Sequence, residues 1–112
     1  MTDAPAITVQ DWAQTRAALQ AARSQGRAVF LCSPKGASSW LGAGYWAALQ
    51  QRARAEFPGL DFTLALDCGD AAGDAMAALR AGVAVVIFHG APAVFAKLQD
   101  MAAQRGAELR AG

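Results

Sequence analysis

The feature that most constrains the fold is an alternation of short apolar runs with Ala-rich segments of helical period. Three runs, at residues 27–33 (RAVFLCS), 61–67 (DFTLALD) and 83–90 (VAVVIFHG), are largely apolar and too short for helices. Such runs are typical of strands that are buried on both faces of a parallel sheet. The segments between them place apolar residues at helical spacing, which predicts alternating strands and helices.

Two weaker strands complete this pattern, at residues 6–9 (AITV) and, as an edge strand, at residues 107–109 (AEL). The order βαβαβαβαβ with right-handed crossovers predicts a single α/β domain over residues 1–112. We expect a three-layer, flavodoxin-like arrangement with helices on both faces of a parallel sheet of four or five strands. The expected strand order is 2-1-3-4-5.

Local signals predict where the helices begin and end. Asp11, Ser39, Asp70 and Asp74 are placed as N-caps. One helix is expected to run from about Ser39 to Phe57.

Composition excludes several classes of function. The net charge of +1 and the scattered Lys and Arg residues argue against binding to nucleic acid. The longest apolar run, residues 83–88, is far below the roughly 20 residues that span a bilayer. Asp3 stands where a secretory signal would carry basic residues, so a cytoplasmic protein is expected.

The two cysteines, Cys32 and Cys68, form no CxxC motif and are predicted to be free thiols. One histidine and two cysteines on separate loops lack the spacing of metal ligands. We therefore predict neither a metal nor a cofactor.

In open parallel sheets, ligands bind beyond the carboxyl ends of the strands. The loops expected at that edge cover residues 10–11, 33–39, 67–74 and 89–92. The residues predicted to bind a ligand there are Ser33, Lys35, Gly36, Ser38, Ser39, Asp67 and Asp70. The alternative is that these polar residues only cap helices and fill loops.

Residues 31–49 (LCSPKGASSWLGAGYWAAL) partly match phosphate-binding motifs. A P-loop needs Lys after its second Gly, but Gly42 is followed by Ala43. Residues 42–47 match GxGxxA, with Asp67 placed like a ribose carboxylate, which would suit a nucleotide binder. However, nine residues separate this motif from the preceding strand. The alternative role of Gly42 and Gly44 is to let the helix pack closely.

The segment FLCSPKGASS resembles the nucleophile loop of the IIB components of cellobiose-type sugar phosphotransferase systems, in which a Cys at a strand end is phosphorylated. The resemblance implies that Cys32 is a nucleophile. It also implies that Gly36, Ser38 and Ser39 form the turn that stabilises the phosphothiolate.

Two further resemblances are at the level of fold and loops. Asp67, at the end of the third predicted strand, is similar to the phosphoacceptor position of the receiver domains of two-component signalling. SPKGA together with DCGDAAGDAMAALRAG resembles small uncharacterised bacterial α/β proteins that share a Ser-Pro-x-Gly loop and an Asp-Cys-Gly-Asp turn. This second resemblance implies no particular activity.

His89 ends the strand next to the one that ends in Cys68. A Cys68–His89 pair with Asp67 or Asp70 nearby would suit nucleophilic catalysis, and a hydrogen-bonded His89 in a turn is the alternative.

Trp40 and Tyr45 lie off the apolar stripe of their helix and would form a rim for a partner surface or a planar ligand. A homodimer is one expected use of that rim.

These observations favour a non-catalytic cytoplasmic module that binds a protein partner or a small anionic ligand at the carboxyl edge. The alternatives are an enzyme or phosphocarrier that uses Cys32, and a nucleotide binder. The catalytic candidates are Cys32, His89 and Asp67.

Overall fold

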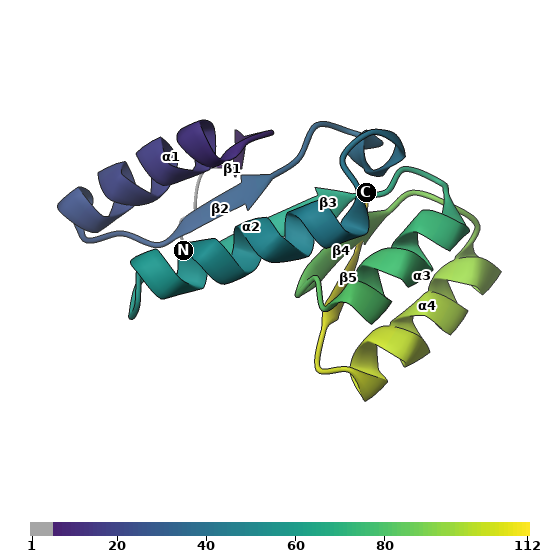
Figure 1. The fold of residues 1–112 in the computed structure, drawn as a ribbon. Coiled ribbons are helices and arrows are strands. Elements are labelled where there is room, and N and C mark those ends of the chain that lie inside the picture. The colour runs from purple at the N-terminus through teal and green to yellow at the C-terminus, as the bar shows by residue number, and fades with distance from the viewer. Residues whose placement is uncertain (1–5) are drawn as a thin grey trace.

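Residues 6–112 form five strands that alternate with four helices in a computed structural model of the chain (Figure 1). Asp3 lies outside these described residues. The α/β class with a five-stranded parallel sheet is confirmed. None of the described helices has the length and apolar character needed to cross a bilayer. The elements are β1 (Ala6–Thr8), α1 (Trp12–Gln25), β2 (Val29–Cys32), the 3-10 turn η1 (Ala37–Ser39), α2 (Ala43–Glu56), β3 (Phe62–Asp67), α3 (Ala72–Ala81), β4 (Val85–Phe88), α4 (Pro92–Gln104) and β5 (Glu108–Ala111).

The strand order is β1-β2-β3-β4-β5, so the predicted order 2-1-3-4-5 is wrong. The predicted order would have made β1 an interior strand, but all three of its residues are exposed. β3 lies at the centre instead, where its last four residues are buried. A three-residue strand cannot offer the apolar surface that an interior position requires, and this explains the difference.

The arrangement of the helices follows from this order. α1 contacts α2, α2 contacts α3 and α3 contacts α4, so the helices lie in one row (Figure 1). Right-handed crossovers that always step in the same direction place every helix on the same face of the sheet. The second layer of helices expected with the order 2-1-3-4-5 is therefore not formed by residues 6–112.

Strand residues alternate between the core and a face without helices. Leu31, Leu64 and Leu66 point into the core that the helices cover. The alternate residues form what we call the helix-free face, which includes Phe30, Cys32, Thr63, Ala65 and Ile87. Arg110 of β5 extends over part of this face, with its guanidinium 4.7 Å from the centroid of the Phe30 ring.

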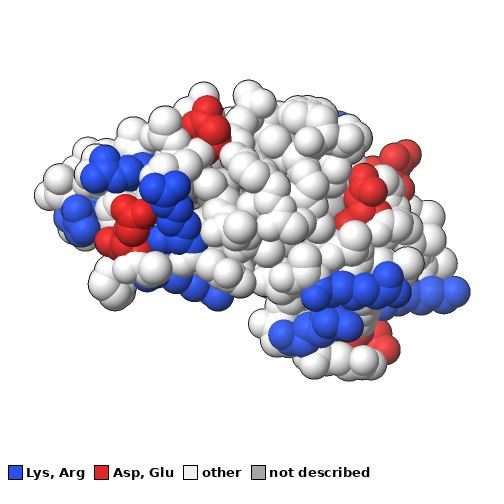
Figure 2. Space-filling model, viewed as in Figure 1, with Lys and Arg blue, Asp and Glu red and all other residues white. Residues whose placement is uncertain are grey.

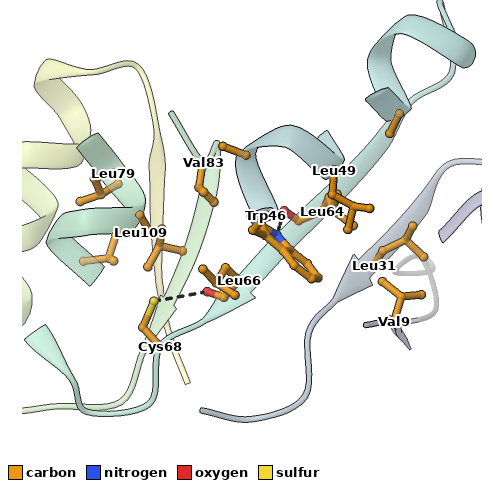
Figure 3. Close-up of a cluster of buried hydrophobic side chains, with 14 of the residues drawn as sticks. Val9, Leu31, Trp46, Leu49, Leu64, Leu66, Cys68, Leu79, Val83 and Leu109 are labelled. Carbon is orange, nitrogen blue, oxygen red and sulfur yellow. Dashed lines mark hydrogen bonds between the residues drawn. The ribbon is translucent and has the colours of Figure 1, made fainter. Parts of the chain in front are cut away.

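Trp46 is the largest fully buried side chain and lies where α2 packs against β3 (Figure 3). Its indole N–H donates a 3.1 Å hydrogen bond to the carbonyl oxygen of Leu64. Leu31 and Leu49 lie beside it in the same cluster. The indole therefore fills the core and also satisfies a buried backbone acceptor.

The predicted start of α1 is confirmed. The carboxylate of Asp11 accepts a 2.8 Å hydrogen bond from the backbone N–H of Gln14, as an N-cap does. Gly26 ends the helix in the left-handed conformation with φ 62°.

The other predicted N-caps are wrong. Ser39 lies in η1, and α2 begins only at Ala43. The N-cap of α3 is Ala71, which leaves neither Asp70 nor Asp74 in that role. The side chain of Asp74 instead accepts a hydrogen bond from Ser38, 36 residues away, and local sequence could not reveal this contact.

We predict that Trp46→Phe lowers the free energy of unfolding by about 2 kcal/mol, because it removes buried volume and the hydrogen bond from the indole to the Leu64 carbonyl. The matched control is Trp40→Phe, since Trp40 is 57% exposed. That change should stay within about 0.5 kcal/mol. Urea unfolding followed by circular dichroism measures both, and equal effects would contradict the described packing of α2 on β3.

Candidate functional site

Asp67, the last residue of β3, joins three loops at the carboxyl edge of the sheet. Its Oδ1 accepts hydrogen bonds from the backbone N–H groups of Gly36 at 3.0 Å and Gly69 at 2.9 Å. Its Oδ2 lies 2.7 Å from Nε2 of His89. One carboxylate thus ties the loop after β2 and the loop after β3 to the turn after β4.

Opposing effects act on the pKa of Asp67. Burial favours the neutral acid and so acts to raise the pKa. The hydrogen bonds from His89, Gly36 and Gly69 favour the carboxylate, and together they hold the pKa below its usual value of 3.8. Asp67 is therefore ionised at neutral pH and accepts the Nε2–H hydrogen bond of His89.

The hydroxyl groups of the serines after β2 all form hydrogen bonds within the protein. Ser33 Oγ accepts a 2.9 Å hydrogen bond from the backbone N–H of Asp67 and donates to the carbonyl of Pro34 at 3.1 Å. Ser38 Oγ donates to Asp74 Oδ2 at 2.8 Å. The hydroxyl of Ser39 donates to the carbonyl of Gly36 at 3.1 Å.

Three backbone N–H groups of this loop also donate hydrogen bonds within the protein. The N–H of Gly36 donates to Asp67, that of Ala37 to Pro34 and that of Ser39 to Gly36. Gly36 has φ 68°, a conformation that favours glycine. These donors hold the loop closed, so they are not free to bind a phosphate.

The structure brings together only part of the predicted site. Ser33, Gly36 and Asp67 form one hydrogen-bonded network, and Ser38 joins Asp74 beside it. Lys35 and Asp70 are exposed and stand apart from this network. Of the expected group of Cys68, His89 and a nearby Asp67 or Asp70, the structure pairs His89 with Asp67, while the thiol of Cys68 lies against the carbonyl of Leu66.

The two cysteines are free and lie on opposite sides of the sheet. Cys32 is half-buried on the helix-free face, in register with Ala65 of β3. Cys68 is buried in the core, where its Sγ lies 3.9 Å from the carbonyl oxygen of Leu66 (Figure 3). Burial raises the pKa of the Cys68 thiol to about 11, which makes it a poor nucleophile at neutral pH.

The expected role of Gly42 and Gly44 in close packing is wrong. A Cβ added at either residue would meet nothing within 4 Å, apart from chain neighbours and the helix's own backbone. Gly42 is the N-cap residue of α2 and has an ordinary extended conformation.

A pocket of about 310 Å³ opens beside His89, lined by Phe88, His89, Gly90, Pro92, Phe95, Ala111 and Gly112. Sequence analysis missed this pocket because it joins the turn after β4 to the end of β5. Gly112 packs so closely on the imidazole that a Cβ there would lie 2.0 Å from Nδ1. The pocket is mainly apolar, and the imidazole of His89 forms its one polar aromatic side.

Carboxylates and aromatic rings surround this edge. Figure 2 shows separate Asp or Glu side chains at the upper left and on the right of the molecule, with uncharged surface between them. Trp40 is 57% exposed and Tyr45 is 44% exposed. The Tyr45 hydroxyl donates a 2.9 Å hydrogen bond to the carbonyl of Gln10, which fixes the ring against the loop after β1.

Within residues 6–112, no group of three or more His, Cys, Asp and Glu residues is placed to hold a metal ion. No protein-family model matches the chain, and no curated protein matches it significantly.

We predict that Asp67→Ala lowers the free energy of unfolding by about 3 kcal/mol at neutral pH, because the donors of Gly36, Gly69 and His89 lose their acceptor. The control is Asp70→Ala, an exposed carboxylate in the same loop, which should change stability by less than about 0.5 kcal/mol.

The effect of Asp67→Ala should depend on pH. The pKa of Asp67 is lower in the folded chain than in the unfolded chain, so its stabilisation is complete above the unfolded value of 3.8. It is lost as the pH falls through the folded value. The difference between wild type and variant in urea unfolding should therefore stay constant from about pH 7 to about pH 4 and shrink as the pH falls further. A difference that stays constant at lower pH as well would show that the carboxylate charge is not what holds the loops.

We also predict that a maleimide labels Cys32 in the native protein and Cys68 only after unfolding. Cys32 is half-buried, whereas Cys68 is buried and has a raised pKa. Mass spectrometry with and without urea measures this, with Cys32→Ser as the control that should abolish native labelling. An intramolecular disulfide formed under mild oxidant would contradict the placement of the thiols on opposite faces.

Proposed function

We propose that the chain is a non-catalytic cytoplasmic module that binds a segment of a partner protein at the carboxyl edge of its sheet. One observation carries the proposal: polar side chains at this edge form hydrogen bonds that hold the loops together. Both oxygens of Asp67 are occupied, and Ser33 and Ser38 are engaged within the network. What the rigid loops present outward is the apolar pocket beside His89 and the exposed ring of Trp40.

The charges at this edge favour a protein partner over a small anion. Asp11 and Asp70 lie in its loops, Asp67 ends β3 and Asp74 lies in the first turn of α3, against the single basic side chain of Lys35. An anion would meet these carboxylates at short range. A segment with an apolar side chain for the pocket and flanking Lys or Arg residues is complementary to both features.

The alternatives have weaker support. A phosphocysteine at Cys32 would need loop N–H groups to stabilise its charge, and those of Gly36, Ala37 and Ser39 are bonded elsewhere. A bound dinucleotide would need the carboxylate of Asp67 for its ribose, and that carboxylate already accepts three hydrogen bonds.

Site-specific photo-crosslinking in cells, followed by purification of the partner, tests the proposal. A benzophenone amino acid replaces Trp40, and the matched control replaces Gln51, an exposed residue of α2. Adducts with the same partner should form from position 40 and not from position 51. Recovery of the chain itself would identify the partner as a second copy.

Binding of the purified partner must then depend on the same edge. Trp40→Ala should weaken the affinity about tenfold or more, as expected for an aromatic anchor. The charge reversal Asp70→Lys should also weaken it, whereas Asp100→Lys, on an exposed position of α4, should not. Equal crosslinking from both positions, or unchanged affinity in Trp40→Ala and Asp70→Lys, would refute the proposal.

A further inference from the structure

Three arginines that are distant in the sequence meet around one pocket at the amino edge of the sheet. The pocket has a volume of about 400 Å³ and is lined by Arg54, Leu79, Arg80, Gly82, Val83, Ala84, Arg105, Gly106 and Ala107. Arg54 lies in the last turn of α2, Arg80 lies in the last turn of α3, and Arg105 is the C-cap of α4. The sequential strand order places these three helix ends next to one another.

The floor of this pocket is held by a buried side chain. Gln50 is 3% exposed, and its Nε2 donates a 3.0 Å hydrogen bond to the carbonyl of Gly82. Its Oε1 accepts a 2.8 Å hydrogen bond from the N–H of Ala84. This amide fixes α2, the helix that carries Arg54, to the turn that follows Arg80 at the end of α3.

The pocket is strongly positive. No acidic residue lines it, and no ion pair within residues 6–112 involves Arg54, Arg80 or Arg105. The nearby carboxylates of Glu56 and Glu108 pair with other arginines. Figure 2 shows two separate groups of Lys and Arg, one at the left near the C-terminal part of α2 and one at the lower right near α3 and α4, with uncharged surface between them.

The negative partial charges at the C-termini of the three helices do not offset all of the positive charge of the arginines. Each helix C-terminus carries about −0.5 elementary charge, so three ends offset about half of the three guanidinium charges. A positive charge of about 1.5 remains around the pocket. Each guanidinium presents a planar fork of N–H donors that matches the oxygens of a phosphate group.

We propose that this pocket is a binding site for a compact anion with several phosphate groups, distinct from the partner-binding carboxyl edge. Its three arginines approach from three helices, so a ligand with linked phosphates can contact more than one of them at once. Its volume suits a small molecule.

Inorganic tripolyphosphate is the probe for this site. Calorimetric titration at constant ionic strength should give saturable binding with one site per chain, stronger for tripolyphosphate than for orthophosphate. The amide resonances of Gly82 and Gly106 should shift on binding, whereas those of Gly36 and Gly69, at the opposite edge, should not.

The matched comparison uses two double variants that remove the same charge. Arg80→Gln with Arg105→Gln should weaken tripolyphosphate binding at least tenfold, while Arg16→Gln with Lys97→Gln should weaken it less than about twofold. Circular dichroism and the urea midpoint check that both variants fold.

Equal losses in the two variants, or a titration that does not saturate, would overturn the proposal. Shifts confined to the loops at the carboxyl edge would overturn it as well. Because the probe, variants and resonances all belong to the amino edge, these outcomes leave the test at Trp40 unaffected.

Discussion

Each strand of this sheet pairs with the strand that precedes it in the sequence, and every crossover steps in the same direction. That constraint places all four helices in one row and buries one face of the sheet beneath them. It also gathers the loops that follow strands at one edge and the C-terminal ends of the helices at the other. The acidic carboxyl edge and the arginine pocket at the amino edge are both consequences of this sorting.

At the carboxyl edge, one carboxylate contacts all three loops. The side chain of Asp67 accepts hydrogen bonds from Gly36, Gly69 and His89. The backbone bond from His89 to Gly69 and the side-chain bond from Ser38 to Asp74 join the same loops a second time. A network with every polar atom paired is stable because no buried group lacks a partner. Among the described residues, no buried side-chain nitrogen or oxygen is without a hydrogen bond.

Much of the fold could be predicted because its signals are local. Apolar runs located β2, β3 and β4, and Asp11 marked the start of α1. The strand order could not be read in this way, since it depends on which strands offer enough apolar surface for the interior. The hydrogen bond of Asp74 was missed for a similar reason, because its donor Ser38 is distant in the sequence.

The sequential strand order also bears on how the chain reaches its folded state. Every strand pairing joins segments separated by one helix, so no strand must wait for a distant part of the chain. Folds built from such near contacts gain stabilising interactions before the entropy of closing long loops becomes large. A chain emerging from the ribosome could therefore add one strand and one helix at a time to an existing sheet, with each new unit completing the core of the one before it.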